Sequence, residues 1–225
     1  MISKVFYLFT YILNQCFSKL KADIHSEIAF NKQSVKGKGN RLEAYRAQIG
    51  HCTFKLSGEN NLFSCQSLLK RSDILIEGDN NRIIIEAGGE IRNIKLWIKG
   101  NGNEIHIGNE VIFNGGRIVC AGSNNRVAIG NDCMFAERIE IWASDTHPIY
   151  KDGQIINPSQ PIYIGEHVWV GTNVTILKGS TLNDGCIIGM GSLVKGEVPS
   201  RVVYAGNPAR VLREDVEWDK STIPL

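Results

Sequence analysis

The stretch that most constrains the fold lies between residues 164 and 198, where aliphatic residues recur at every sixth position. These positions are Ile164, Val170, Ile176, Leu182, Ile188 and Val194. Four residues after each comes a small or β-branched residue, namely Val168, Val174, Ser180, Cys186, Ser192 and Val198. Six residues make one short strand and a corner, so three such units predict a triangular coil of about 18 residues per turn. A helix or an ordinary sandwich has no reason to keep this spacing.

A second repeat extends the coil toward the N-terminus. Five segments of the form G-x-x-N begin at Gly37, Gly58, Gly78, Gly100 and Gly122, at intervals of 21, 20, 22 and 22 residues. Alternating apolar residues flank the later segments and predict strands, while Gly and Asn favour the positive φ of a sharp corner. We therefore expect a solenoid whose rungs turn at aligned corners. Turn capping explains the stacked asparagines, and a carbohydrate-binding edge is the alternative.

Residues 2–20 are apolar and aromatic, and their spacing predicts a helix. Lysines at its C-terminal end would interact favourably with the helix dipole. The uninterrupted apolar run ends at Leu13 and is too short for a bilayer, which needs about 20 residues. The helix either packs on protein or lies in the membrane interface. We divide the chain into an N-terminal apolar helix (1–22), a β-helix (23–203) with an excursion loop (148–162), and a C-terminal capping tail (204–225).

The composition narrows the function further. A formal net charge of +2, without a block of like charges, argues against nucleic acid as a main partner. The six cysteines are scattered and form no C-x-x-C pair, which favours reduced, structural cysteines over disulfides or zinc ligands. We expect a cytoplasmic protein, with peripheral contact to the inner face of the cytoplasmic membrane if residues 2–20 lie in the interface.

The candidate catalytic residue is His147. Adding 22 to Asn125 gives His147, so the corner that carries asparagine in earlier rungs is expected to carry histidine here. Residues 150–161 (YKDGQIINPSQP) are polar and unlike any rung, as in many binding loops. A neutral imidazole with a pKa near 6.5 can accept a proton at physiological pH, so we infer a general base. Asp145 either orients this ring or caps the turn.

Taken together, these features resemble the hexapeptide-repeat acyltransferases, whose fold is a left-handed parallel β-helix. The resemblance covers residues 129–213 and rests on the hexads, on T-H-P followed by a loop, on I-G-x-x-V-W-V-G and on A-G-N-P-A-R-V-L-R. The G-x-x-N rungs and the segment S-D-T-H-P-I-Y look most like the O-acetyltransferases of capsular, lipopolysaccharide or exopolysaccharide sugars. Left-handedness comes from the resemblance alone, because right-handed crossovers are the general rule.

The resemblance implies a homotrimer with active sites between subunits, acetyl-CoA as co-substrate, no metal, and direct acetyl transfer to a sugar hydroxyl. It matches His147 to the catalytic base and Trp169 to the aromatic residue that lines the acceptor or pantetheine tunnel. The positions it implies for acetyl-CoA are Thr172 and Met190 beside the pantetheine arm, and Lys195, Arg210 and Arg213 near the phosphates.

Two further residues are expected on the acceptor side, Asp145 and Asn125. In some family members an asparagine one rung before the histidine orients the acyl group, and Asn114 and Asn125 compete for that role here.

Three other functions remain open at this stage. A metal-dependent carbonic anhydrase on the same coil needs three histidines at one zinc, and only His147 and His167 are expected near each other. A non-catalytic, carbohydrate-binding solenoid would use the asparagine corner and would be indifferent to His147. An N- or O-acetyltransferase of a small amino sugar or xenobiotic would keep the chemistry and change the acceptor.

Overall fold

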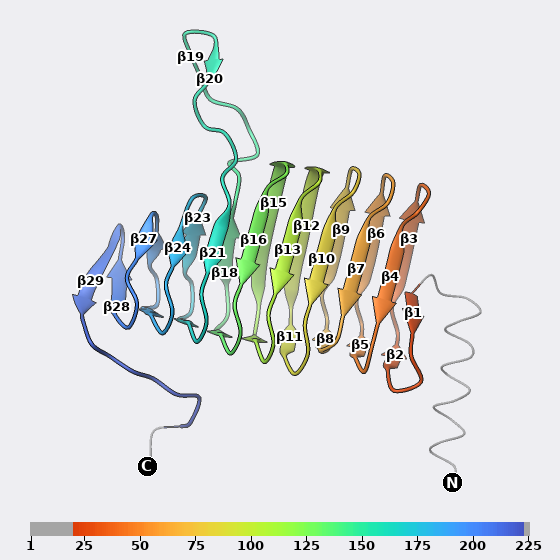
Figure 1. The fold of residues 1–225 in the computed structure, drawn as a ribbon, viewed down its shortest axis with the longest axis horizontal. Coiled ribbons are helices and arrows are strands. Elements are labelled where there is room, and N and C mark those ends of the chain that lie inside the picture. The colour runs from red at the N-terminus through yellow and green to blue at the C-terminus, as the bar shows by residue number, and fades with distance from the viewer. Residues whose placement is uncertain (1–19, 223–225) are drawn as a thin grey trace.

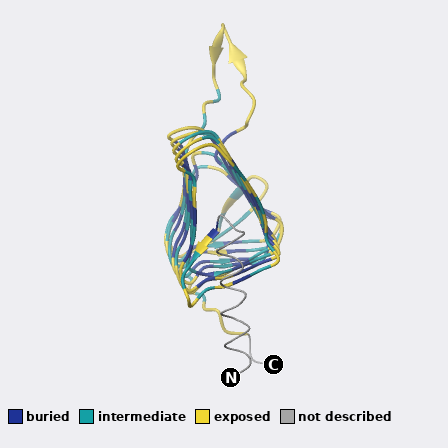
Figure 2. Cartoon of the chain, turned by 90° about the vertical axis from the view of Figure 1, so that its right-hand side faces the viewer, coloured by how far each residue is buried: buried dark blue, intermediate teal, exposed yellow. Residues whose placement is uncertain are grey.

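The protein is described here by a computed structural model that covers residues 20–222. Over this range the chain winds into a parallel β-coil of about eight turns (Figure 1). Viewed along its length, the coil is a triangle with three sheets as its sides, here called A, B and C (Figure 2). The predicted solenoid of parallel strands is therefore confirmed.

The strands of each sheet stack in chain order. Sheet A contains β1 (Leu20–Ala22), β4 (Arg41–Ala44), β7 (Leu62–Cys65), β10 (Arg82–Ile85), β13 (Glu104–Ile107), β16 (Arg126–Ile129), β21 (Ile162–Ile164), β24 (Thr181–Leu182) and β27 (Glu197–Val198). Sheet B contains β2 (Glu27–Ala29), β5 (Gln48–Gly50), β8 (Leu68–Lys70), β11 (Glu90–Arg92), β14 (Ile112–Phe113), β17 (Met134–Phe135), β22 (Trp169–Val170), β25 (Ile187–Ile188), β28 (Val203–Gly206) and β29 (Ala209–Arg213). Sheet C contains β3 (Lys32–Lys36), β6 (Thr53–Ser57), β9 (Asp73–Glu77), β12 (Ile94–Asn101), β15 (Gly116–Ser123), β18 (Ile139–Trp142), β23 (Thr175–Leu177) and β26 (Leu193–Val194).

The strand register shows how the two repeats fit one coil. In the upstream part Ile83 pairs with Ile105, 22 residues on, whereas in the downstream part Ile164 pairs with Leu182, 18 residues on. The upstream turns are longer because their sheet C strands have five to eight residues from β3 to β15, against two or three in β23 and β26. Both repeats therefore place aliphatic residues in the same interior columns.

The interior is filled by these columns. All six hexad aliphatic residues are buried, and so are the six small or β-branched residues that follow them. Aromatic rings fill the wider upstream turns, where Phe113 stacks on Phe135 with ring centroids 4.6 Å apart. Five cysteines also lie in the core, and burial raises the pKa of Cys65, Cys120, Cys133 and Cys186 to about 12. These four thiols are protonated at neutral pH and act as small apolar side chains.

A ladder of asparagines holds the corner between sheets C and A. Asn81 accepts the backbone N–H of Asn103 on its Oδ1 at 2.9 Å, and its Nδ2 donates to the carbonyl of Gly100 at 2.7 Å. The same pattern links Asn61 to Asn81. Glycine begins each corner because the rungs approach closely: a Cβ on Gly78, at φ +117°, would lie 2.2 Å from the carbonyl oxygen of Gly100. The ladder amides satisfy backbone groups, so turn capping explains them and a sugar-binding role does not.

Asn125, predicted to bind substrate, is the last member of this ladder. Its Nδ2 donates to the carbonyl of Ala143 at 2.9 Å and its Oδ1 accepts the N–H of Arg126 at 2.9 Å. The residue is buried, and its amide is occupied by hydrogen bonds within the corner. The prediction that His147 replaces asparagine at the next corner is also wrong. Val127 pairs with Ile162, and this register places Gln160 in the position after Asn125.

The predicted N-terminal helix over residues 1–22 is not supported. Residues 1–19 lie outside the described range, and Leu20–Ala22 form β1, which pairs with β4. Leu20 is buried in the core, so residues 20–22 belong to the coil, which was predicted to begin at residue 23. Within residues 20–222, the structure contains no helix with the length and hydropathy that a membrane crossing requires.

The ladder generates a stability prediction. Asn81→Ala leaves the backbone N–H of Asn103 and the carbonyl of Gly100 without their ladder partner, so the free energy of unfolding should fall by about 1–3 kcal/mol in denaturant titrations. Ser123→Ala, at an exposed position of the same corner, is the matched control and should change stability by less than about 0.5 kcal/mol. Equal stability of the two variants would contradict a structural role for the ladder.

Candidate functional site

An arm projects from the corner between sheets C and A. The chain leaves the coil after Ala143 and returns at Gln160, whose N–H donates to the Ala143 carbonyl at 3.1 Å. Beyond the coil, the antiparallel pair β19 (Tyr150–Lys151) and β20 (Gln154–Ile155) forms the tip (Figures 1 and 2). At the base, Ser159 Oγ donates to Ser144 Oγ at 2.9 Å. The arm therefore has a closed base and an exposed tip.

Asn157 and Lys178 fix the base of the arm. Asn157 Nδ2 donates to the carbonyl of His147 at 2.9 Å and to Asp145 Oδ2 at 2.8 Å. Lys178, from the next rung, donates to Asp145 Oδ2 at 2.5 Å and to the carbonyl of Asn157 at 2.9 Å. The ammonium of Lys178 lowers the pKa of Asp145, and Asn157 adds to this effect against the opposing effect of burial. One lysine therefore ties both legs of the arm to the coil.

His147 lies at this base, exposed, beside a hollow of about 560 Å³. Trp97 and Lys99 of β12 also line this hollow. Asp145 does not orient the imidazole, because its carboxylate bonds to Lys178 and Asn157. It acts instead through the backbone, by holding the turn that carries His147.

A second group of predicted residues lies at the corner between sheets B and C. Thr172 and Met190 occupy successive rungs there, and the carbonyl of Thr172 accepts the N–H of Gly191 at 2.9 Å. Met190 is 77% exposed. Arg210 of β29 pairs with Ala205 of β28, which places it two strands beyond the rung of Met190 in sheet B. These three residues, predicted to contact acetyl-CoA, therefore lie along one side of the coil, and the last of them is a cation.

The two remaining predicted phosphate contacts lie elsewhere. Lys195 follows β26 and, by the pairing of Ile176 with Val194, stands beside Leu177 at the corner of the arm. Its charge contributes to the lowered pKa of Asp145. Arg213 pairs with Val203 at the far end of β29 from Arg210. The structure therefore places Lys195 near Asp145, and separates Arg213 from the corner that carries Thr172.

Upstream of Thr172 the same corner is hollowed, with a volume of about 610 Å³. Asn114 lines this hollow together with the cationic residues Lys95, Arg117 and Arg138. Of the two candidate asparagines, Asn114 and Asn125, Asn114 is therefore the one that lines this hollow. Among the described residues, the buried Nε of Arg117 has no hydrogen-bond partner, and its guanidinium lies over the ring of Trp142 at 5.6 Å.

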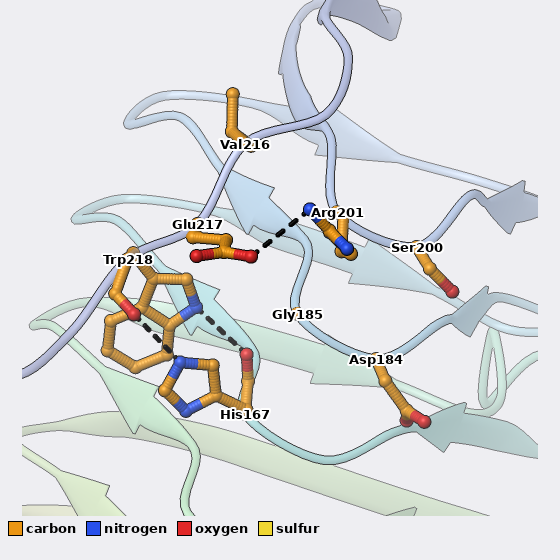
Figure 3. Close-up of a pocket in the computed structure, with 8 residues that line it drawn as sticks. All are labelled: His167, Asp184, Gly185, Ser200, Arg201, Val216, Glu217 and Trp218. Atoms are coloured by element: carbon orange, nitrogen blue, oxygen red, sulfur yellow. Dashed lines mark hydrogen bonds and ion pairs between the residues drawn. The ribbon is translucent and has the colours of Figure 1, made fainter.

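Trp169 lies on the outer face of sheet B and is 38% exposed. The chain's C-terminal segment crosses beside it, and the ring of Trp218 lies 5.9 Å from that of Trp169. His167 stacks on Trp218 and is hydrogen-bonded to it, as Figure 3 shows. His167 therefore holds a contact between residues that are 51 positions apart in the chain.

Sequence reasoning missed four residues of these sites: Trp97, Lys99, Asn157 and Lys178. Asn157-Pro158 inside a polar loop was a detectable turn signal. Lys178 follows its hexad aliphatic residue by two positions, as many surface residues do, so nothing in the sequence marked it. Among residues 20–222, no group of three or more His, Cys, Asp or Glu side chains is placed to hold a metal ion.

The sequence of this chain is similar to those of known proteins. Residues 161–196 match the model for bacterial transferase hexapeptide (six repeats). The polysialic acid O-acetyltransferase of Neisseria meningitidis is 30% identical over 156 residues, which cover 58% of this chain and 72% of that relative. The chain belongs to the hexapeptide-repeat acyltransferases.

The whole coil has a counterpart among solved structures. The crystal structure of the polySia-specific acetyltransferase NeuO covers 90% of each chain with a TM-score of 0.68 and 27% identity, so the coil matches the left-handed β-helix that the resemblance implied. The galactoside O-acetyltransferase of Escherichia coli K12 is 45% identical over 74 residues, or 33% of this chain. Matched segments span only 36% of that relative and 30% of the polysialic acid O-acetyltransferase of Escherichia coli O1:K1.

The arm generates a prediction about Lys178. Lys178→Ala should free both legs of the arm and raise the chymotrypsin cleavage rate at Tyr150 several-fold, because local opening controls proteolysis. Lys55→Ala, on an upstream turn of sheet C, should leave the rate unchanged. In the native protein the folded pKa of Asp145 is lowered, so this anchoring is present above about pH 4 and is lost as pH falls through the lowered pKa. An unchanged cleavage rate in Lys178→Ala would rule out the anchor.

Proposed function

We propose that the protein is an acetyl-CoA-dependent O-acetyltransferase that acts on a hydroxyl of a capsular, lipopolysaccharide or exopolysaccharide glycan, or of its precursor, with His147 as general base. The observation that carries the proposal is the hollow at the base of the arm. An exposed imidazole lines this hollow together with Trp97 and Lys99, and it lies on a turn that Lys178 and Asn157 hold in place.

The chemistry requires a base and a fixed geometry. Acetyl-CoA supplies the acetyl group as a thioester. His147 takes the proton of the sugar hydroxyl as its oxygen attacks, and returns that proton to the departing thiolate, so the imidazole ends the reaction neutral. A base held in position contributes about 10²–10⁴-fold to the rate. The proton balance is complete without a covalent intermediate on the protein.

A glycan acceptor is supported by the walls of the hollow and by the relatives. Trp97 offers a flat apolar face of the kind that packs against sugar rings, and Lys99 offers a cation for polar or anionic groups. Several relatives are named for O-acetylation of polysialic acid, which is a glycan. Three of the predicted coenzyme A contacts, Thr172, Met190 and Arg210, lie along one side of the coil.

The active form that we propose is a homotrimer with sites between subunits. In one chain, His147 lies at the corner of sheets C and A, whereas Trp169 lies on sheet B and Thr172 at the corner of sheets B and C. A neighbouring chain, rotated about an axis parallel to the coil, can bring its sheet B to this chain's arm. The arm also exposes apolar side chains that a neighbour would cover: Ile149 (54%), Tyr150 (63%), Ile155 (56%) and Ile156 (55%).

The first test is the general base. His147→Ala should lower kcat at least about a hundredfold, because the hydroxyl then loses its proton acceptor. Coenzyme A release from acetyl-CoA with a glycan oligosaccharide acceptor measures this, and circular dichroism checks the fold. His25→Ala, at an exposed turn of the first rung, should retain wild-type rates. Near-full activity of His147→Ala would end the assignment.

The second test is subunit complementation. His147→Ala and Trp169→Ala chains should each lose activity alone. Co-expressed at equal levels, they should assemble at random, so that roughly a quarter of all interfaces, counted over mixed and unmixed trimers, pair an intact His147 with an intact Trp169. Activity should return to about that share of the wild-type rate. A mixture no more active than its components would show that each site is complete within one chain.

A further inference from the structure

The C-terminal segment is attached to the coil by a dense set of contacts. Residues 214–222, here called the C-terminal strap, leave the last strand β29 and run back along the corner between sheets A and B. The N–H of Val216 donates to the carbonyl of Arg201 at 3.0 Å. Lys220 donates to the carbonyl of Glu110 at 3.0 Å and forms an ion pair with Asp132 at 2.5 Å. The strap therefore contacts turns from the last one back to that of Glu110.

The centre of the strap is a reciprocal contact between His167 and Trp218. Their rings are stacked, with centroids 4.2 Å apart and planes inclined by 14°. Trp218 Nε1 donates to the carbonyl of His167 at 2.9 Å, and His167 Nε2 lies 2.9 Å from the carbonyl oxygen of Trp218 (Figure 3). His167 Nδ1 lies 2.6 Å from Asp132 Oδ2. Both ring nitrogens face oxygens that only accept, so this geometry is that of the imidazolium.

The result of these contacts is the position of Trp218 against Trp169. The two rings lie 5.9 Å apart and are tilted by 41°. This separation lies within the range of favourable aromatic pairs, and the contact restricts the exposed indole of Trp169. We propose that Trp218 is a positioning residue of the acyl-transfer site, carried to Trp169 by the C-terminal strap and locked there by His167. This inference rests on the proposed function, in which Trp169 lines the path of the substrates.

The lock responds to pH in a defined direction. Burial lowers the pKa of His167, but its hydrogen bonds to the Trp218 carbonyl and to Asp132 outweigh this effect and raise the pKa above 6.5. The attachment is complete below about pH 6.5 and weakens as pH rises through the raised pKa, because a neutral ring can donate only one of the two bonds. The charged groups that act on the His167 ring are Asp132, Lys220 and Asp219. Three further charged residues line the hollow under the strap: Asp184, Arg201 and Glu217.

The test uses the full-length protein labelled with 5-fluorotryptophan. In Trp218→Ala the ¹⁹F resonance of Trp169, assigned with Trp169→Phe, should shift and broaden, because the indole loses its neighbour. KM for the substrate that contacts Trp169 should rise about 5–20-fold, with a smaller loss in kcat. Trp218→Phe retains a ring without the Nε1 donor and should recover part of the effect. Glu217→Gln, which removes the exposed ion pair with Arg201, is the matched control and should resemble the wild type.

A second variant reports on the lock itself. In His167→Gln the Trp169 resonance should take an intermediate position and lose the pH dependence that the wild type shows above about pH 6.5. An unchanged Trp169 resonance in Trp218→Ala overturns the inference, and so does a shifted resonance with unchanged KM values. If the wild type transfers no acetyl group, the proposed function fails by itself. Coenzyme A affinity by calorimetry then replaces KM, and equal affinity of Trp218→Ala and wild type also overturns the inference.

Discussion

Inter-rung backbone hydrogen bonding is the constraint on which the rest of this structure depends. From β1 to β28, each strand of the coil pairs in parallel with its equivalent one turn away, so a given position in the repeat recurs at the same place on the triangle. This register turns a sequence period into columns of side chains, including the aliphatic interior and the asparagine ladder. It also provides stable corners, on which irregular segments can be mounted without disturbing the core.

The functional residues lie where this regularity stops. The arm leaves the coil at the place where the asparagine ladder ends, and Asn125 closes the ladder against the carbonyl of Ala143. Lys178 then bonds to both legs of the arm, which holds His147 over a hollow without burying it. The C-terminal strap is the second irregular segment, and it reaches Trp169 from the C-terminal end of the coil. The regular turns thus fix the spacing between rungs. The arm carries His147, the proposed general base, and the C-terminal strap carries Trp218, the proposed positioning residue.

The sequence predicted most of the coil, because hexads and G-x-x-N corners are local and periodic. It failed where contacts are distant or out of phase. Counting 22 residues from Asn125 led to His147, but the inserted arm lengthens that turn to the 35 residues between Val127 and Ile162. Leu20–Ala22 fit a helical apolar pattern, yet pairing with β4 makes them a strand. The contact of His167 with Trp218 joins residues 51 positions apart, and no repeat in the sequence predicts it.

The most direct measurement is a crystal structure of the protein with coenzyme A and a glycan oligosaccharide bound. The account predicts a trimer in which a nitrogen of His147 lies within about 3.5 Å of an acceptor hydroxyl, and the neighbouring chain's Trp169 lines the same groove. Coenzyme A should follow the side of the coil that carries Thr172, Met190 and Arg210. A His147 ring that faces bulk solvent, with the acceptor bound away from the base of the arm, would contradict it.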